Sequence, residues 1–349
     1  MNIPNKIARF LLSLRYKIEL KNEKILKIKK PTLFLSNHVS HTDPQILVTQ
    51  IFRWQKVSPV VGYGFYDTPI LHTFFKNIKA VRIPEITNFK EKNRENINQS
   101  IQNVKQKLAR GENILLYPSG QTAGQGLEFL FGKKSTFQIL QKFPPNVRIV
   151  GVRIRGLWGS VFLRAWSAEP PNFFLNVLRS FFYLLANFIF FVPKRKVTIE
   201  FEDITEKTKK ISKKSLEEFN KFLEDFFNIY GEEKALFLRH FFFVPKLNKT
   251  LPAKILGSMN DYKSSKKILT NNFDPQILDF LFIEINKIKK IDHKNFSPEK
   301  NLVLDFYFDS LDLTEIISIV QKKFTISKEI KFTEIKTVFD LYQIINRAC

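Results

Sequence analysis

The sequence predicts an α/β domain with a mixed central sheet, followed by a small all-α domain. Short apolar runs typical of strands alternate with helical patterns through the first part of the chain. A stretch rich in Pro, Gly, Ser and Lys then shows little periodicity, and only helical spacing follows it. With 349 residues the chain is long enough for two domains. We therefore expect a first domain over 1–244, a linker over 245–272 and a helical domain over 273–349.

The first domain is expected to contain at least three buried strands. Apolar runs predict them at 32–35, 147–154 and 197–203. A helix over 213–227 and the aromatic run 237–243 are expected to close the sheet. Residues 4–17 have apolar side chains at helical spacing with basic residues between them, which favours a membrane contact or packing on the sheet equally.

The run 173–192 is 20 residues long, with only Asn176, Arg179, Ser180 and Asn187 as polar interruptions. Its length would allow it to cross a bilayer. One crossing, however, would separate strands of the same sheet. We therefore expect the segment from about 171 to 195 to lie in the membrane interface, the alternative being a buried core helix. Basic side chains would then reach toward lipid phosphates: Arg164, Arg179, Lys194, Arg195 and Lys196.

The charge is large and unevenly distributed. The net charge is +23, but residues 271–349 contain 11 basic and 12 acidic residues, so the excess lies in the first part. A basic chain with 37 phenylalanines fits an anionic lipid surface. Nucleic acid is disfavoured because the basic residues flank aromatic runs and form no reading motif. The single cysteine, Cys349, excludes a disulfide framework and suits a reducing cytosol, and no Cys–His cluster indicates a metal.

The candidate catalytic pair is His38 and Asp43, directly after the first predicted strand. A neutral imidazole oriented by a carboxylate can take a proton from an alcohol near pH 7. Taken alone, the pattern also fits a loop histidine followed by a helix-capping aspartate before Pro44. His41 could serve as a second base, although an exposed loop position is expected for it.

Further motifs follow in order: Arg82 in AVRI, the box YPSGQT from Tyr117, and the strand VRIVGVRI leading to a glycine. From residue 25 to 203 this succession resembles the glycerolipid (lysophosphatidic-acid-type) acyltransferase family. The resemblance implies that family's mixed sheet with flanking helices, His38 as general base and Asp43 as its orienting partner. It also implies that Arg82 meets an acceptor phosphate. The remaining substrate-binding residues would come from the third box: Tyr117, Pro118, Ser119, Gly120 and Gln121. Amides around Gly120 are candidate oxyanion donors.

The third box departs from the family pattern. Ser119, Gln121 and Thr122 stand where Glu, Thr and Arg are usual, and Gly151 stands where a proline is common. Losing the arginine removes a phosphate clamp. A lysophospholipid with a masked phosphate, or another lipid alcohol, therefore fits the acceptor at least as well as lysophosphatidic acid. Lys133 and Lys134 either supply the missing charge or form a solvated pair. YPSGQ and IRGLWGS look closer to acyltransferase domains that work with acyl-acyl-carrier-protein synthetases.

The last part of the chain resembles an acyl carrier protein of four helices. Asp309-Ser310-Leu311 opens an amphipathic helix with apolar residues at Leu311, Leu313, Ile316, Ile317 and Val320. The resemblance implies covalent 4'-phosphopantetheine on Ser310, attached by a phosphopantetheinyl transferase. Near-neutral charge departs from the acidic character usual in carriers. A generic helical bundle is the alternative.

Together these features predict a lysophospholipid or glycerolipid O-acyltransferase. It would move a fatty acyl group from an acyl-carrier-protein thioester to a lipid hydroxyl, as a peripheral or monotopic protein on the cytoplasmic face of the cell membrane. The expected partners are membrane lipids and an acyl-ACP synthetase. Two alternatives stay open: a catalytically degenerate carrier and docking protein that serves such a synthetase, and an enzyme that uses free acyl thioesters.

Overall fold

The computed structural model covers the 349-residue chain and describes most of its residues. The described residues are 3–67, 69–83, 91–130, 132–141, 143–164, 172–243, 273–302, 305–306, 308, 310–326, 330 and 335–348.

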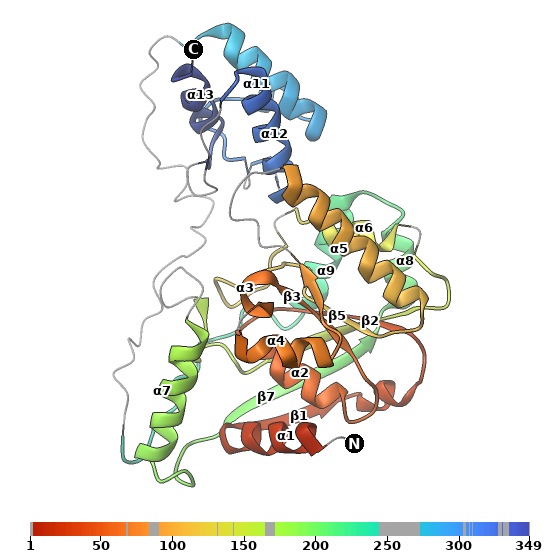
Figure 1. The fold of residues 1–349 in the computed structure, drawn as a ribbon, viewed down its shortest axis with the longest axis vertical. Helices are drawn as coiled ribbons and strands as arrows, with labels where there is room; N and C mark the ends of the chain where they lie inside the picture. The colour runs from red at the N-terminus through yellow and green to blue at the C-terminus, as the bar shows by residue number, and fades with distance from the viewer. Residues whose placement is uncertain are drawn as a thin grey trace.

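Within these residues a seven-stranded mixed sheet forms the centre of the first part of the chain (Figure 1). Its strand order is β1-β7-β6-β2-β5-β3-β4, and every neighbouring pair is parallel except β6 and β7. This confirms the predicted mixed sheet and the three predicted strands, now β2, β6 and β7. The bounds are β1 Tyr16–Lys21, β2 Thr32–Ser36, β3 Ser58–Gly62, β4 Val81–Ile83, β5 Ile114–Leu116, β6 Arg148–Arg155 and β7 Arg195–Asp203.

Both faces of the sheet are covered, which explains why the central strands consist of continuous apolar runs. In β2, Phe34 belongs to one hydrophobic cluster, while Leu33 and Leu35 belong to the other. Helices α1 and α2 cover the first face, and α5, α6, α8 and α9 cover the second (Figure 1). The helices are α1 Ile3–Arg15, α2 Asp43–Ile51, α3 Tyr63–Tyr66, α4 Pro69–Asn77, α5 Glu91–Ala109, α6 Ser135–Leu140, α8 Thr205–Ile211 and α9 Leu216–Phe227, with a 3-10 turn η1 at Glu23–Lys27.

Local signals fix the position of α9 on the sheet. Ser215 and Glu218 form a capping box, so the helix begins at Leu216 rather than at the expected 213. Gly151 in β6 lies beneath this helix. A Cβ there would come within 2.3 Å of the Phe226 ring. The glycine at the position where the resembled family has proline thus allows α9 to pack closely on β6.

Helix α7, Phe173–Ala186, stands apart from the sheet at the left of Figure 1. It begins at the cap residue Asn172, and only Asn176 is fully buried along it. The run 237–243, expected to close the sheet, forms no regular element and packs on α7 instead, with Phe243 5.8 Å from Tyr183 between ring centroids. No helix among the described residues is both long and apolar enough to cross a membrane.

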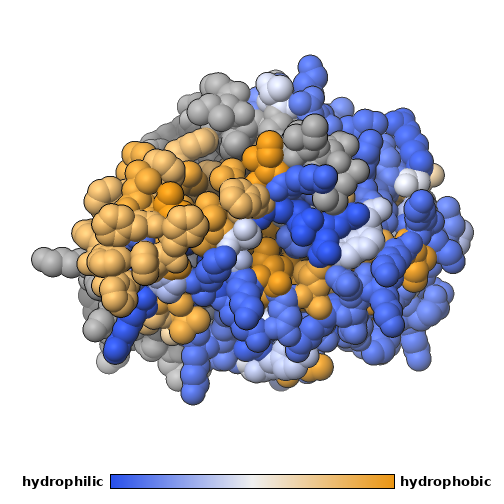
Figure 2. Space-filling view, turned by 90° about the horizontal axis from the view of Figure 1, so that it is seen from below, coloured by the Kyte–Doolittle hydropathy of each residue, from blue (hydrophilic) through white to orange (hydrophobic). Residues whose placement is uncertain are grey.

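Many large apolar side chains of this region are exposed, and they gather in one area of the surface (Figure 2). We call this area the aromatic surface. It comprises Phe174, Leu175, Val177, Leu178, Phe181, Phe182, Leu185, Phe188, Ile189, Phe190, Phe191, Phe241, Phe242 and Phe243. The segment is therefore not the buried core helix that was the alternative.

One of the basic residues expected to reach toward lipid phosphates is buried instead. Arg195 at the start of β7 is only 6% exposed. Its guanidinium donates to the carbonyl oxygens of Gly156, Trp158, Gly159 and Leu236. This expectation was wrong for Arg195, whose side chain ties loops together.

The last part of the chain has its own hydrophobic cluster, which includes Leu281, Ile317 and Leu341. Its described residues form α11 Pro275–Ile288, a 3-10 turn η3 at His293–Asn295, α12 Ser310–Lys323 and α13 Val338–Asn346. A fourth α-helix is not among them. In α12 the predicted apolar residues Leu313, Ile316, Ile317 and Val320 are buried. The side chain of Leu311 lies outside the described residues. Helix α12 lies beside α5 (Figure 1).

Candidate active site

The predicted catalytic pair meets at the carboxyl end of β2. His38 follows the strand by two residues, and Asp43 is the first residue of α2. The Nδ1 atom of His38 lies 3.2 Å from Oδ2 of Asp43. An ionised carboxylate only accepts hydrogen bonds, so Nδ1 carries the hydrogen and Nε2 keeps its lone pair. Nε2 is therefore the atom that can act as a base.

Asp43 organises the loop around the histidine rather than capping the helix, because the N-cap residue is Thr42. Its Oδ2 atom also accepts the backbone N–H groups of Val39 at 2.6 Å and Ser40 at 3.0 Å. Burial of the carboxyl raises the pKa of Asp43, and the bonds from His38, Ser40 and Val39 oppose that rise. The loop therefore folds around a buried acid that faces the imidazole.

The third box wraps around the other sides of His38. The ring of Tyr117 stacks on the imidazole, with 4.3 Å between the centroids. The backbone N–H of Ala123 donates to the carbonyl oxygen of His38 at 2.6 Å. The N–H of His38 itself donates to Oε2 of Glu128 at 3.1 Å. The structure thus brings the predicted pair and the start of the predicted third box together.

Residues 118–121 form a tight turn after β5. Gly120 has a φ of +65°, which favours glycine, and its N–H donates to the carbonyl of Tyr117 at 3.0 Å. This amide is therefore engaged in the turn, which is evidence against Gly120 as an oxyanion donor. Pro118 has no N–H to offer. Ser119 is buried, and its hydroxyl donates to the carbonyl of Gln121 at 3.0 Å.

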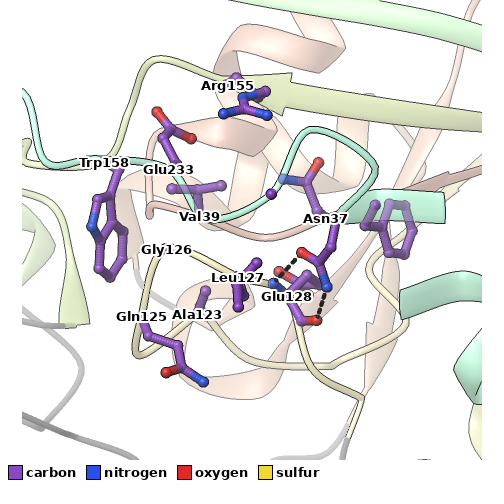
Figure 3. A pocket seen from close by; sticks show the side chains of 13 residues that line it. Asn37, Val39, Ala123, Gln125, Gly126, Leu127, Glu128, Arg155, Trp158 and Glu233 are labelled. Carbon is purple, nitrogen blue, oxygen red and sulfur yellow. Dashed lines mark hydrogen bonds between the residues drawn. The ribbon is translucent and has the colours of Figure 1, made fainter. Parts of the chain in front are cut away.

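Two small pockets adjoin this arrangement. One is lined by Asn37 and Val39, the two neighbours of His38, and by Glu128 (Figure 3). The other is lined by Ser119, Gln121 and again Glu128. Glu128 therefore borders both hollows beside the histidine.

Comparison with known proteins finds a match to the family model described as Acyltransferase over residues 17–155. This segment contains His38, Asp43, Arg82 and the third box. Residues 17–155 match the acyltransferase family.

A solved structure shows weaker similarity. It is the 1-acyl-sn-glycerophosphate (LPA) acyltransferase PlsC from Thermotoga maritima, with 14% identity and a TM-score of 0.43. The similarity covers 64% of this chain and 74% of that protein. No curated protein sequence matches the chain.

Arg164 lies beside the third box of this acyltransferase-type segment, although it follows the matched residues. Its Nη1 atom donates to Oε1 of Gln121 at 3.0 Å. Arg164 was expected at a lipid surface, and no signal in the sequence connected it with the box. A guanidinium therefore stands near the position where the box lacks its usual arginine.

His41 is not the exposed loop histidine that was expected. Its side chain is half-buried, 5.4 Å from the Phe65 ring and 6.5 Å from the His38 ring between centroids. Burial lowers the pKa of His41 to about 4, and the charges of His38 and Arg164 contribute. At neutral pH this histidine is uncharged and lines the same region as His38.

Arg82 lies on β4, the edge strand, three strands away from β2 in the sheet order. Its guanidinium forms an ion pair with Asp67 and lies 6.0 Å from the centroid of the Tyr66 ring. Because β2 and β4 run in the same direction, their carboxyl ends lie at the same end of the sheet. Arg82 therefore lies toward the end of the sheet where His38 lies.

The pair Lys133 and Lys134 was expected either to supply the missing charge or to be solvated. Both expectations are wrong for Lys134. The Nζ atom of Lys134 forms an ion pair with Asp312 of α12. The Asp312 carboxylate is completely buried and also lies 2.9 Å from Nζ of Lys289. Lys134 therefore links the acyltransferase-type part to the helical part of the chain.

Helix α12 begins at Ser310, as predicted. The Ser310 side chain and residue Asp309 lie outside the described residues. The attachment of a prosthetic group therefore stays a prediction.

Proposed function

We propose that this protein is an O-acyltransferase that moves a fatty acyl group from a thioester to a hydroxyl of a glycerolipid at a membrane surface. The observation that carries the proposal is the contact between His38 Nδ1 and Asp43, inside the segment that matches the acyltransferase family. It fixes the tautomer in which Nε2 is a base.

In the proposed reaction Nε2 of His38 removes the proton of the acceptor hydroxyl while the oxygen attacks the thioester carbonyl. The carbon–sulfur bond then breaks, and the imidazolium returns the proton to the leaving thiolate. Asp43 stabilises the imidazolium and keeps the ring oriented, as in other carboxylate–histidine pairs. The scheme contains no covalent acyl-enzyme.

The acceptor is proposed to be a phosphorylated glycerolipid, such as a lysophospholipid. Support comes from Arg164, which is bonded to Gln121 and close enough to His41 to lower its pKa. A guanidinium forms strong paired bonds to phosphate. It would replace the clamp that the third box lacks.

The donor is proposed to be an acyl thioester on the chain's own helical part. 4'-Phosphopantetheine would be held by Ser310 and would supply the thiol that carries the acyl group. The position fits, because α12 begins at Ser310 and a phosphodiester there would meet the amides of a helix N-terminus. A phosphopantetheinyl transferase and an acyl-ACP synthetase would be the partners that prepare it.

The membrane contact is proposed to be the aromatic surface. Its most exposed members are Phe190 at 90% and Phe241 at 75%. Soluble monomers rarely expose apolar patches that extend over a whole helix and its neighbours. A peripheral or monotopic position on the cytoplasmic face would place these side chains in the lipid layer.

The proposal is tested with the purified full chain after co-expression with a phosphopantetheinyl transferase. Intact-mass spectrometry should show the mass of the prosthetic group, and Ser310→Ala should abolish it. The loaded protein is then incubated with vesicles containing lysophospholipids or monoacylglycerol. We expect diacyl phospholipid as the product. Loading without any ester product would favour a degenerate carrier and docking protein.

A further inference from the structure

Glu128 touches His38 but has no part in the proposed proton transfer. Its backbone is held at two points by Asn228, the residue that ends α9. The Glu128 N–H donates to Oδ1 of Asn228 at 2.8 Å, and Nδ2 of Asn228 donates to the Glu128 carbonyl at 2.8 Å. The carboxyl group is thereby fixed relative to the sheet and points at the catalytic loop.

The carboxyl group is buried, at 3% exposure of the residue. Oε2 accepts the N–H of His38 at 3.1 Å, and Oε1 is buried without a hydrogen-bond partner among the described residues. An ionised carboxylate with a buried oxygen that lacks a hydrogen-bond partner would cost free energy. A neutral carboxylic acid can instead carry its proton on that oxygen.

The surroundings favour the neutral acid. Burial raises the pKa of Glu128 to about 8, and the charges of Asp43 and Glu224 add to the rise. The His38 amide, which donates to the carboxyl, opposes it. The Tyr117 phenol also faces this group, and Arg155 and Glu233 line the same pocket.

We propose that Glu128 is a positioning residue for the acyl transfer: its buried, neutral carboxylic acid anchors the His38 peptide, and ionisation of this acid displaces the His38 loop through repulsion from the Asp43 carboxylate. This inference rests on the proposed function for its rate readout.

His38 is held at its backbone and at its ring. Its carbonyl is fixed by Ala123, its amide by Glu128, and its ring by Asp43 and Tyr117. Once ionised, Glu128 would be a buried anion close to Asp43, and the two charges repel. Water would have to enter through the pockets that Glu128 lines, and the His38 loop would move. A displacement of about 1 Å can lower a catalysed rate by about a hundredfold.

The first test uses the full chain with Glu128→Ala and Glu128→Gln. We expect Glu128→Ala to lower kcat by about ten- to a hundredfold with little change in KM, because the acceptor site itself is intact. Glu128→Gln should rescue most of this loss at pH 7, since the amide oxygen also accepts the His38 N–H. Equal kcat in wild type and Glu128→Ala would overturn the proposal.

The pH profile separates positioning from a merely structural role. With a pKa of about 8, about one tenth of Glu128 stays protonated at pH 9, so wild-type kcat should fall about tenfold between pH 7 and 9. Glu128→Gln cannot ionise and should lack this fall. Glu217→Gln is the control: it removes an exposed carboxyl of α9 and should keep the wild-type profile. Parallel wild-type and Glu128→Gln profiles contradict the inference.

A readout independent of turnover separates this inference from the proposed function. The imidazole resonances of His38 are followed by NMR from pH 6 to 10. The wild type and Glu217→Gln should show an inflection near pH 8 that Glu128→Gln lacks. If no variant forms ester but this inflection behaves as expected, the reaction assignment fails and the anchor stands. If the inflection persists in Glu128→Gln, the anchor fails.

Discussion

At the scale of single residues, the site depends on how a buried acid is arranged. One oxygen of Asp43 accepts hydrogen bonds from three donors, two of which are backbone amides of the loop that carries His38. The same carboxylate therefore shapes the loop and selects the histidine tautomer. An amide at this position can keep these hydrogen bonds, but it lacks the negative charge that stabilises the imidazolium.

Asp43→Asn should therefore fold normally but lose activity. The Asn oxygen can accept the same three donors, but the neutral amide lacks the charge that stabilises the imidazolium formed during proton transfer. We expect kcat to fall by about 10²- to 10⁴-fold, with a melting temperature close to that of the wild type. Asp225→Asn, on the exposed side of α9, is the control and should keep full activity. Retained activity in Asp43→Asn would show that the charge of Asp43 is not decisive.

Arg164 is the residue on which the acceptor proposal depends. Arg164→Gln should raise KM for lysophospholipids by about tenfold or more, because a charged bond to phosphate contributes roughly 1.5–3 kcal/mol. The KM for monoacylglycerol, which has no phosphate, should not change. Equal shifts for both acceptors, measured with vesicles of the same composition, would assign Arg164 a structural role only.

At the scale of elements, the regular part of the fold was predictable and the irregular part was not. The strands β2, β6 and β7 were predicted because strands that are buried on both faces consist of continuous apolar runs. His38, Asp43 and Tyr117 lie directly after such strands, so their meeting was predictable from strand ends that share one edge of the sheet.

Glu128, Arg164 and the changed role of Lys134 had no comparable signal. Each side chain reaches its partner through a loop whose path depends on contacts distant in sequence, such as the Asn228 clamp on Glu128. The run 237–243 misled because an aromatic stretch reads as core, whereas here it packs on α7 beside exposed rings. The composition shows that a segment is apolar, but it does not show which element packs against that segment.

The aromatic surface on α7 and the residues around it gives a prediction at this scale. Phe190→Ser combined with Leu178→Ser should weaken binding to vesicles of anionic phospholipid by about tenfold or more, since each fully buried apolar side chain contributes roughly 1.5–3 kcal/mol. Ile283→Ser on α11 removes a side chain that is 50% exposed outside this surface, and it should bind like the wild type. Co-sedimentation measures both. Unchanged binding of the double variant would remove the aromatic surface from the membrane contact.

At the scale of the whole molecule, the buried Asp312 carboxylate joins two parts of the chain. Lys289 belongs to the helical part and Lys134 to the acyltransferase-type part. Without Lys134 the buried carboxylate would keep its ion pair with Lys289 of its own part of the chain but would lose its ion pair with the other part. Lys134 should therefore hold α12 in place beside α5 without being needed to fold either part.

Lys134→Ala should loosen the two parts relative to each other. Spin labels on Lys221→Cys in α9 and Asp279→Cys in α11, in a Cys349→Ser background, report the distance between them. We expect one narrow distance distribution in the parent protein and a broad one after Lys134→Ala. Lys210→Ala, an exposed lysine of α8, should leave the distribution narrow. An equally narrow distribution in Lys134→Ala would show that other contacts fix the arrangement.

The most direct measurement is the single-turnover rate of ester formation by the loaded full chain with His38 replaced by alanine. The proposed mechanism predicts a fall of about 10²- to 10⁴-fold, with acceptor and vesicle binding intact. A rate equal to that of the wild type would contradict the mechanism, because removal of the acceptor proton would then not require His38.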